Sequence, residues 1–187
     1  MYVTNTSIGK RPPAALDGWH FGESPKLATP ARSVDIYISV EGTKQGKFKG
    51  ETSMVKGFTG QSRVFKFSYG VVSPRDVSTG QASGKRQHKA IVITREPGAA
   101  TPQFFAALVS NEMLKSIVIQ FFRRNATGAN ELQQTITLTN ASISDFRQYV
   151  GDDGRWLEDV AFVFQQIQIE NTLNKTVAAD SWLARAA

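Results

Sequence analysis

Few residues of this sequence have the types and spacing that acid–base or metal chemistry needs. The chain has two histidines and no cysteine. His88 stands at the start of a predicted strand, which favours a structural hydrogen bond over catalysis, and His20 lies beside Trp19 in an irregular segment. Asp152 and Asp153 are adjacent acids between two glycines, a pattern typical of a solvated turn and at best a weak cation site.

The sequence also lacks the longer motifs that are typical of nucleotide-binding proteins and hydrolases. The sequence contains no Gly-x-Ser-x-Gly, P-loop or dinucleotide-binding fingerprint. Gly57 and Gly60 lie in a segment without the context that would place their backbone around a phosphate. The residues therefore predict a protein that is not an enzyme and that uses no metal and no cofactor.

Composition indicates an ordinary globular domain. The chain has 187 residues, of which 41% are hydrophobic and 20% charged, so a single domain with a real core is expected. No run approaches the roughly 18 apolar residues of a spanning helix, which predicts no membrane insertion, and residues 1–30 show no signal-peptide pattern. The net charge of +6 comes from basic residues scattered along the chain, which favours plain solubility over nucleic-acid binding.

The stretch Gly84–Phe122 predicts a strand, a short helix and a second strand. Residues 88–95 are rich in β-branched side chains and end at Pro97-Gly98. Thr101 is a candidate N-cap with Pro102 at the first helical position, and the helix is expected over about residues 102–111. After this helix the apolar residues return to a period of two, which is typical of a strand.

Most of the remaining chain alternates apolar and polar residues. The segments expected to be strands are residues 34–40, 64–69, 132–139 and 157–170, with a bulge near Asn140. In residues 64–69, Lys66 and Ser68 face solvent or a lumen if the aromatic set Phe65, Phe67 and Tyr69 faces the core. Residues 42–60 and 72–87 are expected to be long loops.

Residues 1–33 form a predicted irregular arm, which Trp19 and Phe21 would anchor, and residues 34–187 form the domain.

About seven β segments and one short helix predict a mainly β fold, either an antiparallel barrel or a tight sandwich. A small open barrel exposes edge strands, which proteins either cover or use for pairing. If identical subunits pair head to tail and the rotation closes, the product is a ring.

Four stretches of the chain, in this order and spacing, resemble the Hcp family, the tube proteins of bacterial type VI secretion systems. They are Asp35–Gly42, Phe67-Ser68-Tyr69-Gly70, the run Gly84–Lys89 with the helix that follows it, and Asp180-Ser181-Trp182. The resemblance covers roughly residues 34–182. It implies a hexameric ring, the stacking of such rings, and a lumen that carries effector proteins.

The resemblance also suggests roles for particular residues. Contacts between subunits are expected along residues 42–60 and at the strand start, with Lys44, Lys47, Phe48, Lys49, Arg86, His88 and Lys89 as candidates. Lys66 and Ser68 are candidates for facing the lumen, and Asp180 and Trp182 are expected to tie the tail back onto the barrel.

The implied partners are other copies of the chain and the sheath, spike and effectors of the apparatus. Assembly in the bacterial cytoplasm, followed by export with the apparatus and without a signal peptide, is the implied localisation.

Three alternatives remain open from the sequence. A tail-tube protein of a phage-like contractile particle would share the fold, and genome neighbours would separate the two. A monomeric β-barrel that binds a small apolar ligand predicts a monomer with a closed pocket, whereas an enzyme would need a constellation that the residues lack. The size of the protein in solution distinguishes a ring from a monomer.

Overall fold

Strands make up most of the folded chain. The computed structural model describes residues 34–51, 59–125 and 127–182, so the predicted arm with Trp19 and Phe21 lies outside the described residues. The elements in chain order are β1 (Val34–Gly42), β2 (Ser62–Val64), β3 (Lys66–Ser68), β4 (Val71–Val72), β5 (Gln87–His88), β6 (Ile91–Arg95), α1 (Thr101–Val109), β7 (Leu114–Arg124), β8 (Asn130–Val150), β9 (Trp156–Asn171) and β10 (Thr176–Ser181).

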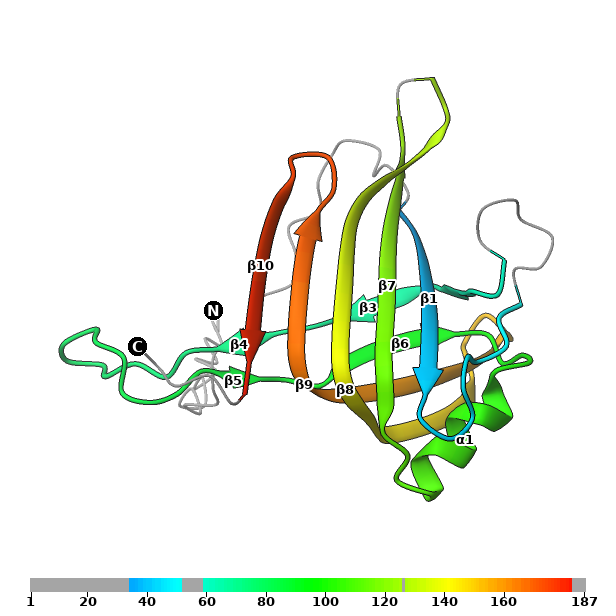
Figure 1. Cartoon of the computed structure of the whole chain (residues 1–187), viewed down its shortest axis with the longest axis horizontal. Helices are drawn as coiled ribbons and strands as arrows, with labels where there is room; N and C mark the ends of the chain where they lie inside the picture. The colour runs from blue at the N-terminus through cyan, green and yellow to red at the C-terminus, as the bar shows by residue number, and fades with distance from the viewer. Residues whose placement is uncertain (1–33, 52–58, 126, 183–187) are drawn as a thin grey trace, which may run out of the picture. The chain divides into compact units, whose positions relative to one another are not determined.

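The main sheet is antiparallel and closes on itself. Its strand order is β2-β1-β7-β8-β9-β6-β3, with β10 paired to β9 beyond the end of β6. The segment 62–68 joins the two ends, because β2 pairs with β1 (Ile36 opposite Val64) and β3 pairs with β6 (Phe67 opposite Ile93). In Figure 1, β3 and β6 cross behind the long strands β7 and β8. The predicted antiparallel barrel with one helix is therefore confirmed.

The barrel interior is filled with apolar side chains from every main strand. Ile38, Ile93, Ile119, Leu138 and Phe162 are all at most 2% exposed. The alternation predicted for residues 34–40 places Ile38 and Val40 in this core. Helix α1 covers one end of the barrel, where Phe104 and Ala107 are buried.

The helix begins one residue earlier than predicted and ends two residues earlier. Ala100 is the N-cap residue and makes no side-chain cap, so the prediction that Thr101 caps the helix is wrong. Thr101 lies inside the first turn, where its hydroxyl accepts a hydrogen bond from the N–H of Gly98 (2.8 Å) and donates to Glu158 (3.1 Å). Asn111, with a φ of 48°, follows the helix end, as expected for a left-handed C-terminal residue.

Two details of the strand predictions also differ from the structure. The aromatic alternation over residues 64–69 breaks at Phe65, which is 37% exposed while Val64 is buried, because the chain leaves β1 and joins β6 at that residue. The register shift in β8 lies between Ile143 and Asp145 rather than at Asn140. Asn140 itself has a positive φ of 50°, which is uncommon for a residue other than glycine.

The predicted loop 72–87 is in fact part of a two-stranded ribbon. Strands β4 and β5 pair through Val71 opposite His88 and Val72 opposite Gln87, and they form a sheet separate from the barrel. A bridge between Arg75 and Ala82 continues the ribbon toward its tip. Because β5 ends at His88 and β6 starts at Ile91, the strand predicted over residues 88–95 is interrupted.

Candidate assembly interface

The base of the β4–β5 ribbon contains a cluster of polar and aromatic side chains, here named the Asp180 cluster (Tyr69, Arg86, His88, Asp180 and Trp182). Arg86 donates through Nε and Nη2 to both carboxylate oxygens of Asp180. The Nε2 atom of His88 lies 2.8 Å from the same carboxylate, and its Nδ1 atom lies 2.7 Å from the Tyr69 hydroxyl. Both hydrogen bonds are satisfied when Nε2 carries the proton and Tyr69 donates to Nδ1.

These contacts fix the charge of the carboxylate. The hydrogen bonds from Arg86, aided by those from His88 and the Ser181 N–H, hold the pKa of Asp180 at about 2, although burial acts in the opposite direction. Burial, followed by the negative charge of Asp180, raises the pKa of Tyr69. The carboxylate is therefore ionised and the phenol neutral across the physiological range, which suits a fixed structural contact rather than proton transfer.

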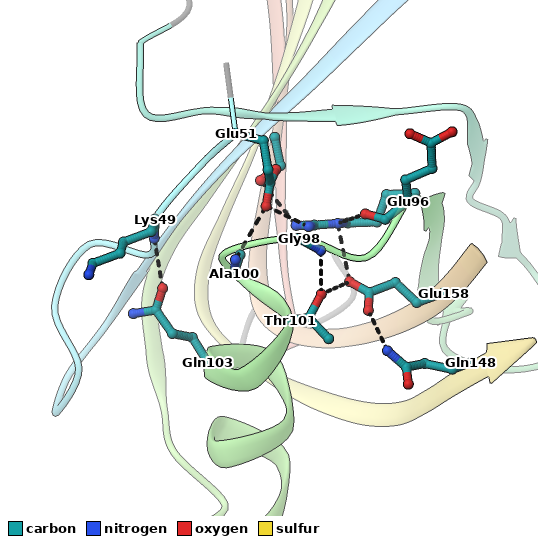
Figure 2. A network of polar contacts seen from close by, with 11 residues as sticks. Lys49, Glu51, Glu96, Gly98, Ala100, Thr101, Gln103, Gln148 and Glu158 are labelled. Carbon is teal, nitrogen blue, oxygen red and sulfur yellow. Dashed lines mark hydrogen bonds and ion pairs between the residues drawn. The ribbon is translucent and has the colours of Figure 1, made fainter. Parts of the chain in front are cut away.

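A second cluster lies under the N-terminus of α1, here named the Arg95 cluster (Glu51, Ser62, Arg95, Gln148 and Glu158). Arg95 and Glu158 are 1% and 0% exposed, and their closest atoms lie 3.1 Å apart. Arg95 also donates to Glu51 (2.7 Å) and to the Ser62 hydroxyl (3.0 Å). Figure 2 shows Glu51, Thr101 and Glu158 converging from different parts of the chain. The cluster thus joins the loop after β1 to β2, β6, β8 and β9, and Thr101 of α1 contacts it through Glu158.

Two carboxylates hold the loop that follows β1. Burial alone would raise the pKa of Glu51, but the charge of Arg95 and hydrogen bonds from Ser62, the Ala100 N–H and Arg95 lower it below its usual value. Burial would likewise raise the pKa of Glu112, which the N–H groups of Gln45 and Lys44 and the Gln45 amide lower. Both acids stay ionised and bind backbone N–H groups of the chain around them.

The residues predicted to contact neighbouring subunits fall into three groups. Lys44, Lys47, Lys49 and Lys89 are exposed. Phe48 is buried in the core, where its ring packs on Phe104 at 5.3 Å, so its side chain is not available to a neighbour. Arg86 and His88 make their contacts within the Asp180 cluster.

The candidates for the lumen and for tail anchoring lie on different parts of the molecule. Lys66 and Ser68 are exposed on β3, on either side of half-buried Phe67. Asp180 and Trp182 lie together at the end of β10, and the Trp182 ring contacts the His88 ring at 5.5 Å.

The described residues include no group of three or more His, Asp or Glu side chains that could hold a metal ion. One open groove has a volume of about 560 Å³, and its lining includes Met113, Asn140, Val163 and Trp182 and contains no acidic or basic side chain. Within the described ranges, helices of the length and apolarity needed to cross a bilayer do not occur.

Sequence reasoning missed the residues of the Arg95 cluster. Arg95 follows a run of β-branched residues, Ile91–Thr94, and Glu158 follows the apolar residues Trp156 and Leu157 at the start of β9. A charged residue inside a strand that is otherwise buried must be paired, so these positions carried a detectable signal. The partner of each charge was not detectable, because Arg95 and Glu158 are far apart in the sequence.

Comparison with known proteins gives one consistent result. The family model described as "Type VI secretion system effector, Hcp" matches residues 37–170. The chain is 36% identical over 172 residues to the "Major exported protein" of Pseudomonas aeruginosa, a match that covers 83% of this chain and 96% of the relative.

Solved structures agree with the sequence comparison. "Crystal structure of Hcp protein" has a TM-score of 0.75 at 25% identity, covering 79% of this chain and 99% of the other. "Secreted protein Hcp3 from Pseudomonas aeruginosa" has a TM-score of 0.69 at 30% identity, covering 81% and 100%.

Proposed function

Because this chain belongs to the Hcp family of type VI secretion system tube proteins, we propose that it forms hexameric rings that stack into a tube and carry effectors through the lumen. The protein performs no catalysis in this role; a contracting sheath supplies the work. Its partners are other copies of itself, the sheath, the spike and the effectors. Rings form in the bacterial cytoplasm and leave the cell with the apparatus.

The observation that carries this proposal is the outer edge of β10. Among the described strands, β10 pairs with β9 alone. The N–H of Trp182 donates to the Gln165 carbonyl (3.0 Å), and the β10–β9 register has no shift. Since backbone groups alternate in direction along a strand, the N–H groups of Val177 and Ala179 face away from β9. No proline or charged side chain protects Thr176–Ala179, so this edge suits pairing with a second copy.

The exposed candidates have separate parts in this proposal. Lys44, Lys47, Lys49 and Lys89 contribute to contacts between copies. Lys66 and Ser68 on β3 face the lumen, where they meet transported proteins. Buried apolar side chains from the main strands pack in the barrel interior, which is why the ring is favoured over a monomeric ligand-binding barrel.

Sedimentation velocity combined with electron microscopy of the purified protein tests the proposal. The expected result is an annular particle with the mass of six chains. A species with the mass of one chain at every concentration, with no annuli on the grid, would contradict it. The tail-tube alternative predicts the same particle and is separated by the genes that neighbour the coding sequence.

A further inference from the structure

The β4–β5 ribbon has almost no buried surface of its own. Between residues 71 and 87, every residue except Pro74 and Arg86 is exposed, and Val77 at the tip is fully exposed. A two-stranded ribbon without a hydrophobic face is marginally stable in water. The direction in which it leaves the barrel must therefore be set by contacts at its base.

Those contacts come mainly from the end of β10. Arg86 and His88, two residues apart on the same side of the chain, both bind the Asp180 carboxylate. Arg86 also donates to the Ser181 carbonyl (3.1 Å), and the Ser181 N–H donates to Asp180 (2.7 Å). The side chains of Arg86 and Asp180 are 31% and 25% exposed, so water partly screens their attraction.

Aromatic rings enclose the side chain of His88 more completely than those of Arg86 and Asp180 are enclosed. The His88 side chain is 6% exposed. Its ring stacks on Tyr69 (6.2 Å between centroids) and meets the edges of Phe164 and Trp182 (5.5 Å each). Hydrogen bonds to a charged group strengthen when water is excluded, so the bond between His88 and Asp180 is better protected than the bonds between Arg86 and Asp180.

We propose that the segment Asp180-Ser181-Trp182 holds the base of the β4–β5 ribbon against the barrel. This contact sets the direction in which the ribbon projects. In the intact chain the carboxylate fixes Arg86 and His88, and Trp182 covers the His88 ring. When these contacts are removed, the ribbon separates from the barrel while the barrel remains folded. The end of β10 that orients the ribbon is also next to the edge proposed above for pairing between copies.

Hydrogen exchange measured by mass spectrometry on the full chain tests this inference. Asp180→Asn keeps the shape and removes the charge. The expected result is that amides in residues 71–89 exchange at least about tenfold faster, as the loss of charged hydrogen bonds implies. Amides of β7 and β8 should be unchanged. Trp182→Ala should accelerate the same amides, and Asp180→Asn combined with Arg86→Gln should add little to either single change.

Asp153→Asn is the matched control, because Asp153 also accepts a hydrogen bond from an arginine (Arg155, 2.7 Å) but lies in the β8–β9 turn. It should leave residues 71–89 unaffected. Unchanged exchange at the ribbon in Asp180→Asn, or equal acceleration in both variants, overturns the inference. The contacts lie within one subunit, so the measurement stays interpretable even if the protein forms no ring.

Discussion

At the scale of single residues, we expect the buried pair Arg95–Glu158 to be sensitive to substitution, because both side chains are charged and almost fully buried. Arg95→Met leaves the carboxylate of Glu158 buried without its cation, and we expect the free energy of unfolding to fall by about 3–5 kcal/mol. Urea denaturation measures the change. Combining Arg95→Met with Glu158→Leu should recover part of the loss, because the uncompensated charge is removed.

Lys115→Met is the control for this prediction. Lys115 lies 3.5 Å from Glu41 in an exposed ion pair, and such pairs contribute about 0–1 kcal/mol. If Arg95→Met and Lys115→Met cost the same, the Arg95 cluster does not stabilise the barrel as described.

The Asp180 carboxylate should give the stability of the molecule an acid-dependent component. Its pKa in the folded protein is about 2, below its ordinary value of 3.8, because Arg86, His88 and the Ser181 N–H bind the ionised form. A depressed pKa contributes stability that is complete above the unfolded value and is lost as the pH falls toward the folded value. The difference in unfolding free energy between the wild type and Asp180→Asn should therefore be constant above about pH 5 and shrink between pH 4 and pH 2. A difference independent of pH would show that the charge does not matter.

At the scale of elements, the period of apolar residues predicts most of the strands and the helix. Alternation in residues 34–40 and 132–139 corresponds to β1 and β8, because one face of each strand packs into the core. The predictions fail where a tertiary contact redirects a residue. The Thr101 hydroxyl turns to Glu158 instead of capping α1, and Phe65 lies where the chain passes from one strand partner to another. Both contacts are distant in sequence, so local patterns do not contain them.

The crossing of two chain segments at Gly50 gives a prediction for the loop after β1. A Cβ atom at residue 50 would lie 2.2 Å from the backbone oxygen of Gln61, a distance that requires the backbone to move. Gly50→Ala should lower the free energy of unfolding by about 1–3 kcal/mol. Gly84→Ala is the matched control, because a Cβ atom there would meet only Pro74 at an ordinary 3.8 Å. Thermal or urea unfolding compares the two, and equal stability would mean that the segments do not cross so closely.

At the scale of the whole molecule, sequence and structure contribute different parts of the functional conclusion. The order of four short stretches indicates the family before any coordinates are considered. The coordinates add the closed barrel, the separate ribbon and the position of the β10 edge, which depend on pairing between distant segments. The charged clusters also became visible only in three dimensions, since the partners Arg86 and Asp180 are 94 residues apart in the sequence.

The N–H groups along β10 point alternately toward β9 and away from it. A substitution at an outward-facing N–H can therefore test ring formation without affecting the folding of the subunit. The N–H of Ala179 faces away from β9, so Ala179→Pro removes a donor from the outer edge and leaves the pairing with β9 intact. We expect this variant to keep the circular dichroism and melting temperature of the wild type but to sediment with the mass of one chain. Ala178→Pro removes an N–H that faces β9 and should instead destabilise β10 itself. If Ala179→Pro still forms rings of wild-type size, subunits do not join through this edge, and the contacts must be sought at the exposed lysines or along the ribbon.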